Sequence, residues 1–238
     1  WGLDDAGNVS QPCATAYVFR AHSGPFGVVN SEEGYQNLTR FLFGDVRADL
    51  SVAISAVRLP GALEGKDVRA LYQFEAKASP RGKRWYLTRR TAEEDSVACR
   101  TLDDLRGVDA SRREVYLSSV FLARAARVDP TRPSLAFVCE LGVRTPDYEV
   151  DRRFWPDRHY EGGYLFRDAL VLEVIPPQAP GAPWNVTGTW ESQQGAGPTF
   201  ARSFDPALGD PLVEVPFSAP GAPGIDGLLR VQLSLWNA

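Results

Sequence analysis

The chain has few of the residues that bind metals or form disulfides. It contains three cysteines at wide spacing, two histidines and no methionine. No Cys-x-x-Cys pair occurs, so neither a zinc site nor a disulfide framework is indicated. No apolar run approaches the roughly 20 residues that a transmembrane helix needs. The formal net charge of −4 at pH 7 gives no basic footprint for nucleic acid. We therefore expect no metal, no cofactor and no nucleic-acid partner.

The composition is otherwise that of an ordinary globular chain. Hydrophobic residues make up 44% of the 238 residues and charged residues 24%, enough to bury a core in one large domain or one domain with an appendage. Cys139 lies in an apolar run and is predicted to be a buried free thiol. The arginines between positions 81 and 90 are interleaved with apolar residues, which predicts solvated strand faces.

Residues 17–44 carry the clearest local pattern. An apolar run at 17–19 predicts a short strand, and polar residues at 20–24 predict a turn that places His22 just after it. A loop then leads into a helix. An imidazole in this position suits a general base that must reach a nucleophile supplied from elsewhere. The alternative is a loop histidine that only hydrogen-bonds a carbonyl.

The helix after this turn is well marked. Asn30 is a good N-cap, and Glu33 completes a capping-box pattern. Acids in the first turn and an arginine in the last suit the helix dipole. Gly44 is predicted to end the helix. Four apolar residues fall at helical spacing on one face: Tyr35, Leu38, Phe41 and Leu42.

The motifs AHSG, VNSEE and RFLFGD, as they stand between residues 14 and 45, resemble the carboxy-terminal end of an α/β-hydrolase of the lipase and esterase type. The resemblance covers about a fifth of the chain. It implies that His22 is the histidine of a catalytic triad, placed after the last strand of the hydrolase sheet and before a helix. It also implies ester hydrolysis, with lipids as the expected substrates.

The chain departs from that family in one respect. The family nucleophile precedes the histidine and lies on a Gly-x-Ser-x-Gly elbow, and this motif does not occur here. The 21 residues before His22 leave no room for a sheet, so we expect this chain to be the carboxy-terminal part of a longer hydrolase. The absence of methionine agrees with that expectation. Asp4 or Asp5 has the right order to be a triad acid, although a loop position is favoured. Ser23 is favoured as a turn-forming hydroxyl.

After residue 45 the sequence changes to alternating β-patterns. About eight or nine short strands are separated by turn signals, with almost no helix. This predicts a mainly β chain: an antiparallel β-sandwich over 46–238, preceded by the strand, turn and helix of a hydrolase tail at 1–45. Two hairpins are expected, one joining 71–76 to 85–88 and one joining 115–128 to 135–143.

Two places in the expected sandwich are candidates for binding. Residues 144–163 are predicted to form a long irregular loop rich in aromatics and arginines, including Trp155 and His159. Such a loop suits a lipid headgroup or a peptide, but a structural plug over the sandwich is favoured. The acids at 93–95 with Asp103 and Asp104 suggest calcium, although a solvated acidic face is favoured because no EF-hand spacing is present.

The leading hypothesis is therefore the carboxy-terminal part of a serine ester hydrolase, supplying His22 and an accessory sandwich. Its ester or lipid substrate would be reached through a catalytic domain outside this chain. The alternative is a non-catalytic β-sandwich module that binds lipid or protein. Contact with a membrane surface stays open, and the residues do not define the compartment or the oligomeric state.

Overall fold

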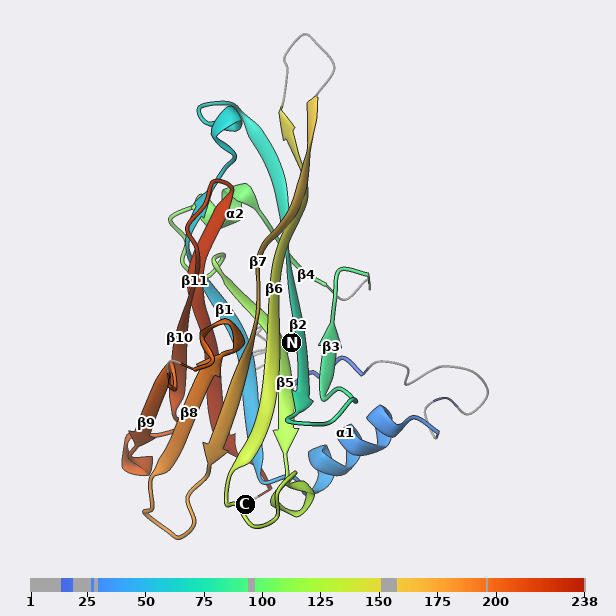
Figure 1. The fold of residues 1–238 in the computed structure, drawn as a ribbon, viewed down its shortest axis with the longest axis vertical. Helices are drawn as coiled ribbons and strands as arrows, with labels where there is room; N and C mark the ends of the chain where they lie inside the picture. Colours follow the sequence, from blue (N-terminus) through green and yellow to red (C-terminus); the bar gives the residue numbers. More distant parts are fainter. Residues whose placement is uncertain are drawn as a thin grey trace, which may run out of the picture.

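The strands predicted after residue 45 form two antiparallel sheets in the computed structural model (Figure 1). The structure describes residues 14–18, 27, 30–93, 97–150, 158–195 and 197–237, with the backbone alone at 158 and 159. This described part is mainly β, which confirms the predicted fold class. It contains eleven strands, more than the eight or nine expected, because short strands also form at the sheet margins.

The smaller sheet has four strands in the order β10-β11-β1-β5. The larger one has seven strands, six of them in the order β3-β2-β6-β7-β8-β9, and β4 pairs with β2. The first sheet consists of β1 (Val46–Arg58), β5 (Glu114–Leu122), β10 (Leu212–Ala219) and β11 (Gly224–Leu235). The second consists of β2 (Val68–Pro80), β3 (Thr88–Arg90), β4 (Ala98–Thr101), β6 (Leu135–Val150), β7 (Arg158–Ile175), β8 (Trp184–Trp190) and β9 (Phe200–Phe204).

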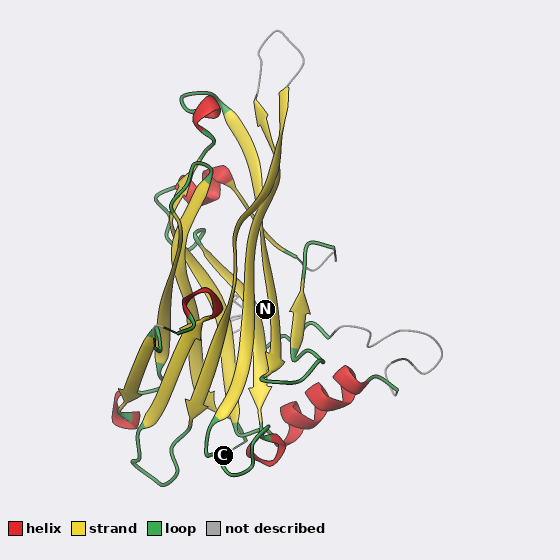
Figure 2. Ribbon diagram, in the orientation of Figure 1, coloured by secondary structure: helices red, strands yellow, loops and turns green. Residues whose placement is uncertain are grey.

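Helices are few and lie at the periphery of the sheets (Figure 2). The two α-helices of the described chain are α1 (Glu32–Phe43) and α2 (Leu102–Arg106). Short 3₁₀ turns are η1 (Gly61–Leu63), η2 (Arg124–Ala126), η3 (Glu191–Gln193) and η4 (Pro206–Leu208).

The core lies between the two sheets and follows from the alternation of each strand. In β1 every second residue from Val46 to Ile54 is 3% exposed or less. The largest buried side chains on the facing sheet include Tyr72, Phe137 and Trp184. Cys139 is buried and free, as predicted. The sequence pattern after residue 45 therefore specifies a sandwich-like core.

The two expected hairpins have different outcomes. β2 and β3 pair antiparallel, with Ala78 opposite Thr88, so the first hairpin is confirmed, although its second strand begins at Thr88 and not at 85. The second hairpin is wrong. β5 pairs with β1 in the smaller sheet, whereas β6 pairs with β2 and β7 in the larger one. The connection at 123–134, which includes η2, crosses between sheets, and local turn signals do not encode that choice.

Most of the loop expected at 144–163 is a long β-ribbon, so that expectation is wrong for its described residues. β6 continues to Val150 and β7 begins at Arg158. Tyr148 pairs with Tyr160 across the ribbon, and the start of β2 pairs along its other edge, with Val68 opposite Val150. The apolar alternation that marks a half-buried strand is weak in this part of the sequence, because the buried side of β6 carries Thr145 as well as Tyr148 and Val150.

Helix α1 begins one residue later than predicted. Ser31, not Asn30, is the N-cap, and its hydroxyl accepts a hydrogen bond from the Gly34 amide at 2.9 Å. The helix ends before Gly44, as expected. The reason for glycine there is a close approach, because a side chain on Gly44 would collide with the carbonyl oxygen of Arg40. Residues 17 and 18, expected as part of a strand, are not in a strand of either sheet.

Candidate functional site

His22, the candidate catalytic residue, lies outside the described residues, as do Asp4, Asp5 and Ser23. The structure does describe the chain on both sides of His22, namely residues 14–18 before it and α1 after it. These two flanks and their contacts with the sandwich are therefore the part of the predicted site that geometry can address. Both flanks are held by residues that sequence patterns did not single out.

Residues 14–18 lie between the edge strands β3 and β5, one from each sheet. On the β3 side, the amide of Arg89 donates to the Tyr17 carbonyl at 2.7 Å. The Tyr17 amide donates to the hydroxyl oxygen of Thr88 at 3.0 Å, and Thr88 is fully buried. One residue of the segment is thus fixed through both of its backbone polar groups.

The other side of the segment is fixed to β5. The Ser119 amide donates to the Thr15 carbonyl at 2.7 Å, and the Ser118 hydroxyl donates to the same oxygen at 2.9 Å. The Thr15 amide donates to the hydroxyl oxygen of Tyr116 at 3.1 Å. A hydrogen bond of 2.8 Å between the Ser118 and Thr88 hydroxyls joins the two sides beneath the segment. The segment therefore links the open edges of both sheets.

Arg90 reinforces this link and is not on a solvated face, which corrects the expectation for the arginines at 81–90. Its guanidinium donates to the carbonyl oxygens of Tyr116 and Leu117 at 2.8 and 3.0 Å. It also lies 4.5 Å from the ring centre of Tyr17. Partial burial lowers the pKa of Arg90, since desolvation disfavours its charged form. Arg81, by contrast, is exposed and pairs with Glu173 at 2.5 Å.

The helical flank rests on the turn that precedes β3. The side-chain amide of Asn37 donates to the Tyr86 carbonyl at 3.0 Å and to the Glu33 carbonyl at 2.9 Å. The guanidinium of Arg40 lies 4.7 Å from the Trp85 ring centre, and desolvation lowers the pKa of this arginine. Asn37 and Arg40 are 6% and 4% exposed. The polar side of α1 is therefore the side that packs on the sandwich.

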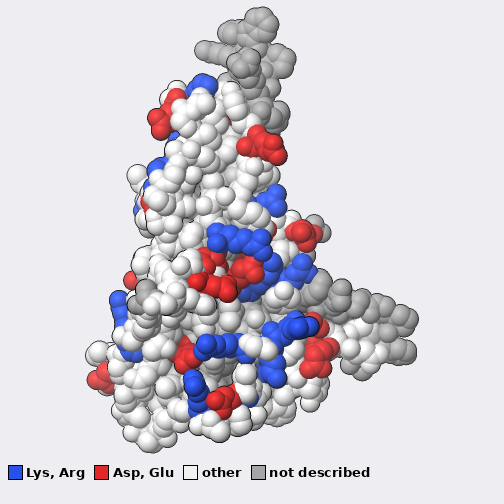
Figure 3. Space-filling view, viewed as in Figure 1, with Lys and Arg blue, Asp and Glu red and all other residues white. Residues whose placement is uncertain are grey.

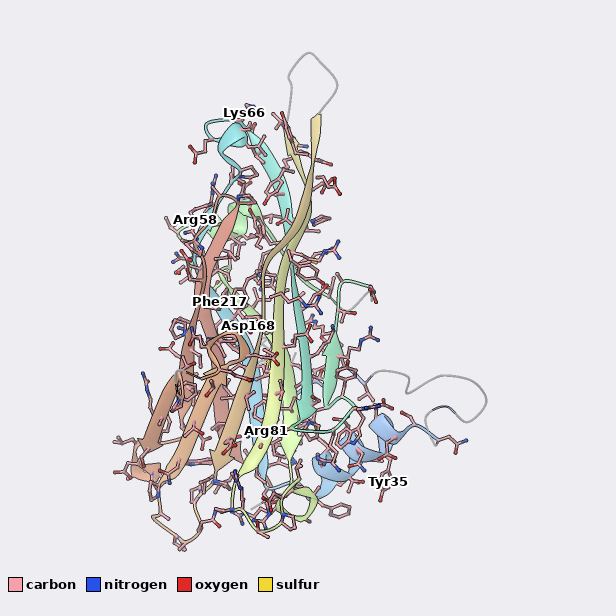
Figure 4. All side chains as sticks on the ribbon, viewed as in Figure 1. Tyr35, Arg58, Lys66, Arg81, Asp168 and Phe217 are labelled. Atoms are coloured by element: carbon pink, nitrogen blue, oxygen red, sulfur yellow. The ribbon has the colours of Figure 1, made fainter. Side chains whose placement is uncertain are left out.

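The apolar face of α1 points the other way. Tyr35 lies on the side of the helix away from the sheets (Figure 4) and is 62% exposed. Leu38 and Phe43 are 58% and 74% exposed, and Leu42 and Phe41 are 49% and 44% exposed. A helix of a globular domain usually buries such a stripe. Here the described chain leaves it uncovered except at Phe41, whose ring packs against Phe121 and Trp236.

The far end of α1 is tied to the carboxy-terminal residues after β11. The indole nitrogen of Trp236 donates to the Phe41 carbonyl at 2.7 Å, and the Asn237 side chain donates to the same oxygen at 3.1 Å. The rings of Phe41, Trp236 and Phe121 of β5 pack together, with centroids 5.0–5.6 Å apart. The middle and the carboxy-terminal end of the helix are thus fixed to the sandwich.

The second candidate region, 144–163, was expected to be a loop rich in aromatics and arginines. Its described residues belong to strands β6 and β7 instead. Tyr148 is buried at 1% exposure, while Tyr160 is half-buried with the Lys66 amine 6.0 Å from its ring centre. Arg144 lies 5.7 Å from the Tyr164 ring centre. Trp155 and the side chain of His159 lie outside the described residues. The described aromatics here serve packing of the ribbon.

Charged side chains on the outer face of the larger sheet are paired. Glu140 accepts hydrogen bonds from Arg167 at 2.8 Å and from Lys77 at 3.3 Å. Glu75 is 7% exposed and accepts from the Tyr164 hydroxyl at 2.8 Å and the Ala92 amide at 2.9 Å. Figure 3 shows acidic and basic groups interleaved over the middle of this view. No basic patch for an anionic polymer appears on it.

The described acids among those considered for calcium are used locally or are exposed, and Glu94 and Asp95 lie outside the described residues. Asp104 completes the capping box of α2, whose N-cap is Thr101, by accepting from the amide and hydroxyl of Thr101 at 3.2 and 2.8 Å. These hydrogen bonds lower the pKa of Asp104. Asp103 is exposed, and Glu93 pairs with Arg89 at 3.5 Å. Within the part of the chain that the structure describes, no three His, Cys, Asp or Glu residues are grouped as a metal would require.

A cleft of about 490 Å³ opens between the start of β2, the β4–α2 corner and the end of β6. Its lining includes Asp67, Asp103, Asp147 and Glu149, together with Arg69.

Among the described helices, none is long and apolar enough to cross a membrane.

Comparisons with protein-family models, curated proteins and solved structures found no match to this chain. The functional argument therefore rests on the motifs around His22 and on the geometry of its two flanks. Sequence reasoning identified the flanks but missed the residues that hold them. A buried Thr88 and Asn37 give no sequence signal, because either residue occurs equally well in a turn or at a surface.

Proposed function

We propose that this chain is the carboxy-terminal part of a serine ester hydrolase, with lipids as the expected substrates. His22 acts as the general base, and the sandwich is an accessory domain that packs beside the catalytic domain. The serine nucleophile is supplied from outside this chain. The motifs AHSG, VNSEE and RFLFGD support the hydrolase class.

The observation that carries the proposal is the orientation of α1. This helix follows His22, and its polar residues Asn37 and Arg40 are buried on the sandwich while Leu38 and Phe43 stay exposed. An apolar stripe of this kind is stabilised when another surface covers it, at about 25 cal/mol per Å² of apolar area. A helix shared between the sandwich and a catalytic domain accounts for both of its faces.

The chemistry asked of His22 is proton transfer. The neutral imidazole takes the proton of the serine hydroxyl as that oxygen attacks the ester carbonyl, and it then protonates the leaving alcohol. Water repeats the sequence on the acyl-enzyme and releases the acid. A carboxylate on the second ring nitrogen orients the imidazole and stabilises the imidazolium. An imidazole with a pKa near 6.5 suits this role close to neutral pH.

The test is labelling of the longest natural chain by a fluorophosphonate, which reacts with activated serines. We compare the wild type with His22→Ala and use His159→Ala as the matched control, since the chain has two histidines. General-base removal should slow labelling by about 10²–10⁴-fold. The His159 variant should label at the wild-type rate. Circular dichroism and thermal melting report whether each variant is folded.

Absence of labelling in the wild type, or equal labelling of a folded His22→Ala, would contradict the proposal. The second candidate, a sandwich that binds lipid or protein without catalysis, would then be favoured. Its supporting observation is the same uncovered face of α1. Co-sedimentation of residues 1–238 with vesicles, compared between the wild type and Leu38→Ser, measures that alternative directly.

A further inference from the structure

Two arginines that are far apart in the sequence line one small pocket, and we propose that this pocket binds a carboxylate group. The pocket has a volume of about 20 Å³ and lies where α1 meets the ends of β2 and β5 and the start of β6. Arg40 of α1 and Arg127, which follows η2, both line it. Among the described residues, no aspartate or glutamate belongs to this lining. The inference depends neither on His22 nor on ester hydrolysis.

Arg40 is a buried cation that has no carboxylate partner among the described residues. It is 4% exposed. Its Nη1 donates to the backbone carbonyl of Gln36 at 3.1 Å and to the side-chain oxygen of the same residue, and the guanidinium lies 4.7 Å from the Trp85 ring centre. Its Nε and Nη2 atoms make no hydrogen bond within the described chain. Two donor groups of this guanidinium therefore remain for a ligand.

Glu32, in the first turn of α1, does not neutralise this charge. Burial lowers the pKa of Arg40 by more than Glu32 raises it. The Glu32 carboxylate is exposed and accepts a hydrogen bond from the Gln36 side chain at 2.9 Å. A buried charge without an ionic partner is costly. A carboxylate in contact with Arg40 would offset part of that cost, because charge-assisted hydrogen bonds are strong where little water screens them.

Arg127 adds a second positive charge to the pocket. Its Nε and Nη1 atoms donate to the backbone carbonyls of Arg124 and Arg132 at 3.0 and 2.9 Å, so its guanidinium is held on the connection between β5 and β6. Asp129 on the same connection pairs with Arg132 at 3.4 Å. The rest of the lining is apolar and includes Leu122, Val128 and Leu135. Apolar walls reduce screening by water and so strengthen the attraction of both arginines for an anion.

The size of the pocket limits the chemistry of its ligand. A volume of about 20 Å³ is little more than the roughly 10–15 Å³ that one water molecule needs, so only the end group of a ligand enters. Guanidinium groups pair with carboxylates through hydrogen bonds in one plane, and a planar carboxylate is smaller than a tetrahedral phosphate. The carboxylate belongs either to a small free acid or to an aspartate or glutamate outside this chain.

Acetate is the probe, and acetamide is a neutral control of nearly the same shape. Each is titrated into residues 1–238 at constant ionic strength, maintained with chloride, while NMR follows the side-chain Nε–H signals of the arginines. We expect acetate to shift the Arg40 signal until the site is saturated, and acetamide to leave it unchanged. At an acetate concentration ten times Kd, the melting temperature should rise by roughly 3–6 °C.

Three variants assign the binding to the pocket. Arg40→Gln should weaken acetate binding about tenfold or more and remove the melting shift. Arg127→Gln, at a half-buried position, should weaken binding about threefold to tenfold and serves if Arg40→Gln does not fold. Arg202→Gln is the matched control, because Arg202 is exposed on β9 and does not line the pocket. It should bind acetate as the wild type does.

Wild-type affinity for acetate in folded Arg40→Gln, or in Arg127→Gln, overturns the carboxylate site. An equal response to acetamide does so too. Inorganic phosphate that shifts the Arg40 signal at lower concentration than acetate overturns the assignment to carboxylates.

The longest natural chain distinguishes the two sources of the carboxylate. An Arg40 signal that already lies at the acetate-bound position, and that acetate does not move, assigns the carboxylate to the rest of the protein. A signal that acetate shifts as it does in residues 1–238 assigns it to a free acid. A signal that stays at the unbound position throughout the titration overturns the site.

Discussion

Helix α1 packs its polar side on the sandwich and exposes most of its apolar side. This inverted packing predicts which side of the helix contributes to stability. Asn37→Ala removes a buried donor from the carbonyl oxygen of Tyr86. An acceptor left unpaired in a buried position costs about 1–3 kcal/mol. Two effects reduce this cost. Alanine has the better helix propensity by roughly 0.5 kcal/mol. The substitution also removes the Oδ1 atom of Asn37, which is buried without a hydrogen-bond partner. We expect a net loss of about 1–2 kcal/mol in unfolding free energy.

The adjacent residue is the matched control. Leu38 is 58% exposed, and substitutions at such surface positions change stability by about 0.5 kcal/mol or less. In an ordinary amphipathic helix the order would be reversed, with the leucine costing several times more than the asparagine. Which of the two substitutions costs more unfolding free energy therefore distinguishes the two orientations of the helix, whatever the absolute values are.

Urea unfolding of residues 1–238, followed by circular dichroism, measures both variants. The midpoint should fall for Asn37→Ala at an unchanged m-value. Native-state hydrogen exchange of the α1 amides supplies a second readout, because a helix that detaches locally is not seen in global unfolding. A larger loss for Leu38→Ala than for Asn37→Ala in both measurements would refute the inverted packing and the argument built on it.

Three further predictions follow from contacts elsewhere in the chain. Asp226 receives hydrogen bonds from Arg58 at 2.5 and 3.0 Å, and these lower the pKa of Asp226 in the folded chain. They stabilise the folded state fully above the ordinary carboxyl pKa. This stabilisation is lost as the pH falls through the lowered pKa of the folded chain. Asp226→Asn should therefore lower the melting temperature at pH 7 and flatten its acid dependence. Gly44→Ala should cost about 1–3 kcal/mol in urea unfolding, since the new methyl group meets backbone and not a movable side chain. Cys139 is fully buried, and desolvation raises its pKa to about 12, so a thiol reagent at pH 8 should modify it only after urea unfolds the chain, as peptide mass spectrometry would show.

The mainly β class of the fold could be predicted because each strand shows its own alternation of apolar and polar residues. The alternation from Val46 to Ile54 buries one face of β1 whatever its partners are. Sheet membership could not be predicted, since β5 and β6 are equally apolar and the turn between them favours a hairpin as well as a crossover. The ribbon at 144–150 and 158–163 was missed because its buried side is only partly apolar, with Thr145 buried as well as Tyr148 and Val150.

Around the candidate site, too, local sequence patterns determined some features and the tertiary structure determined the others. The sequence by itself determined the helix after His22, its acidic start and its end at Gly44, because caps, dipole and propensity act over a few residues. It also determined that this helix is amphipathic. Only the tertiary structure decided which side is buried: the Tyr86 carbonyl and the Trp85 ring offer polar and stacking partners, so Asn37 and Arg40 face inward and Leu38 faces outward. That choice depends on residues some 50 positions away, which no local pattern can contain.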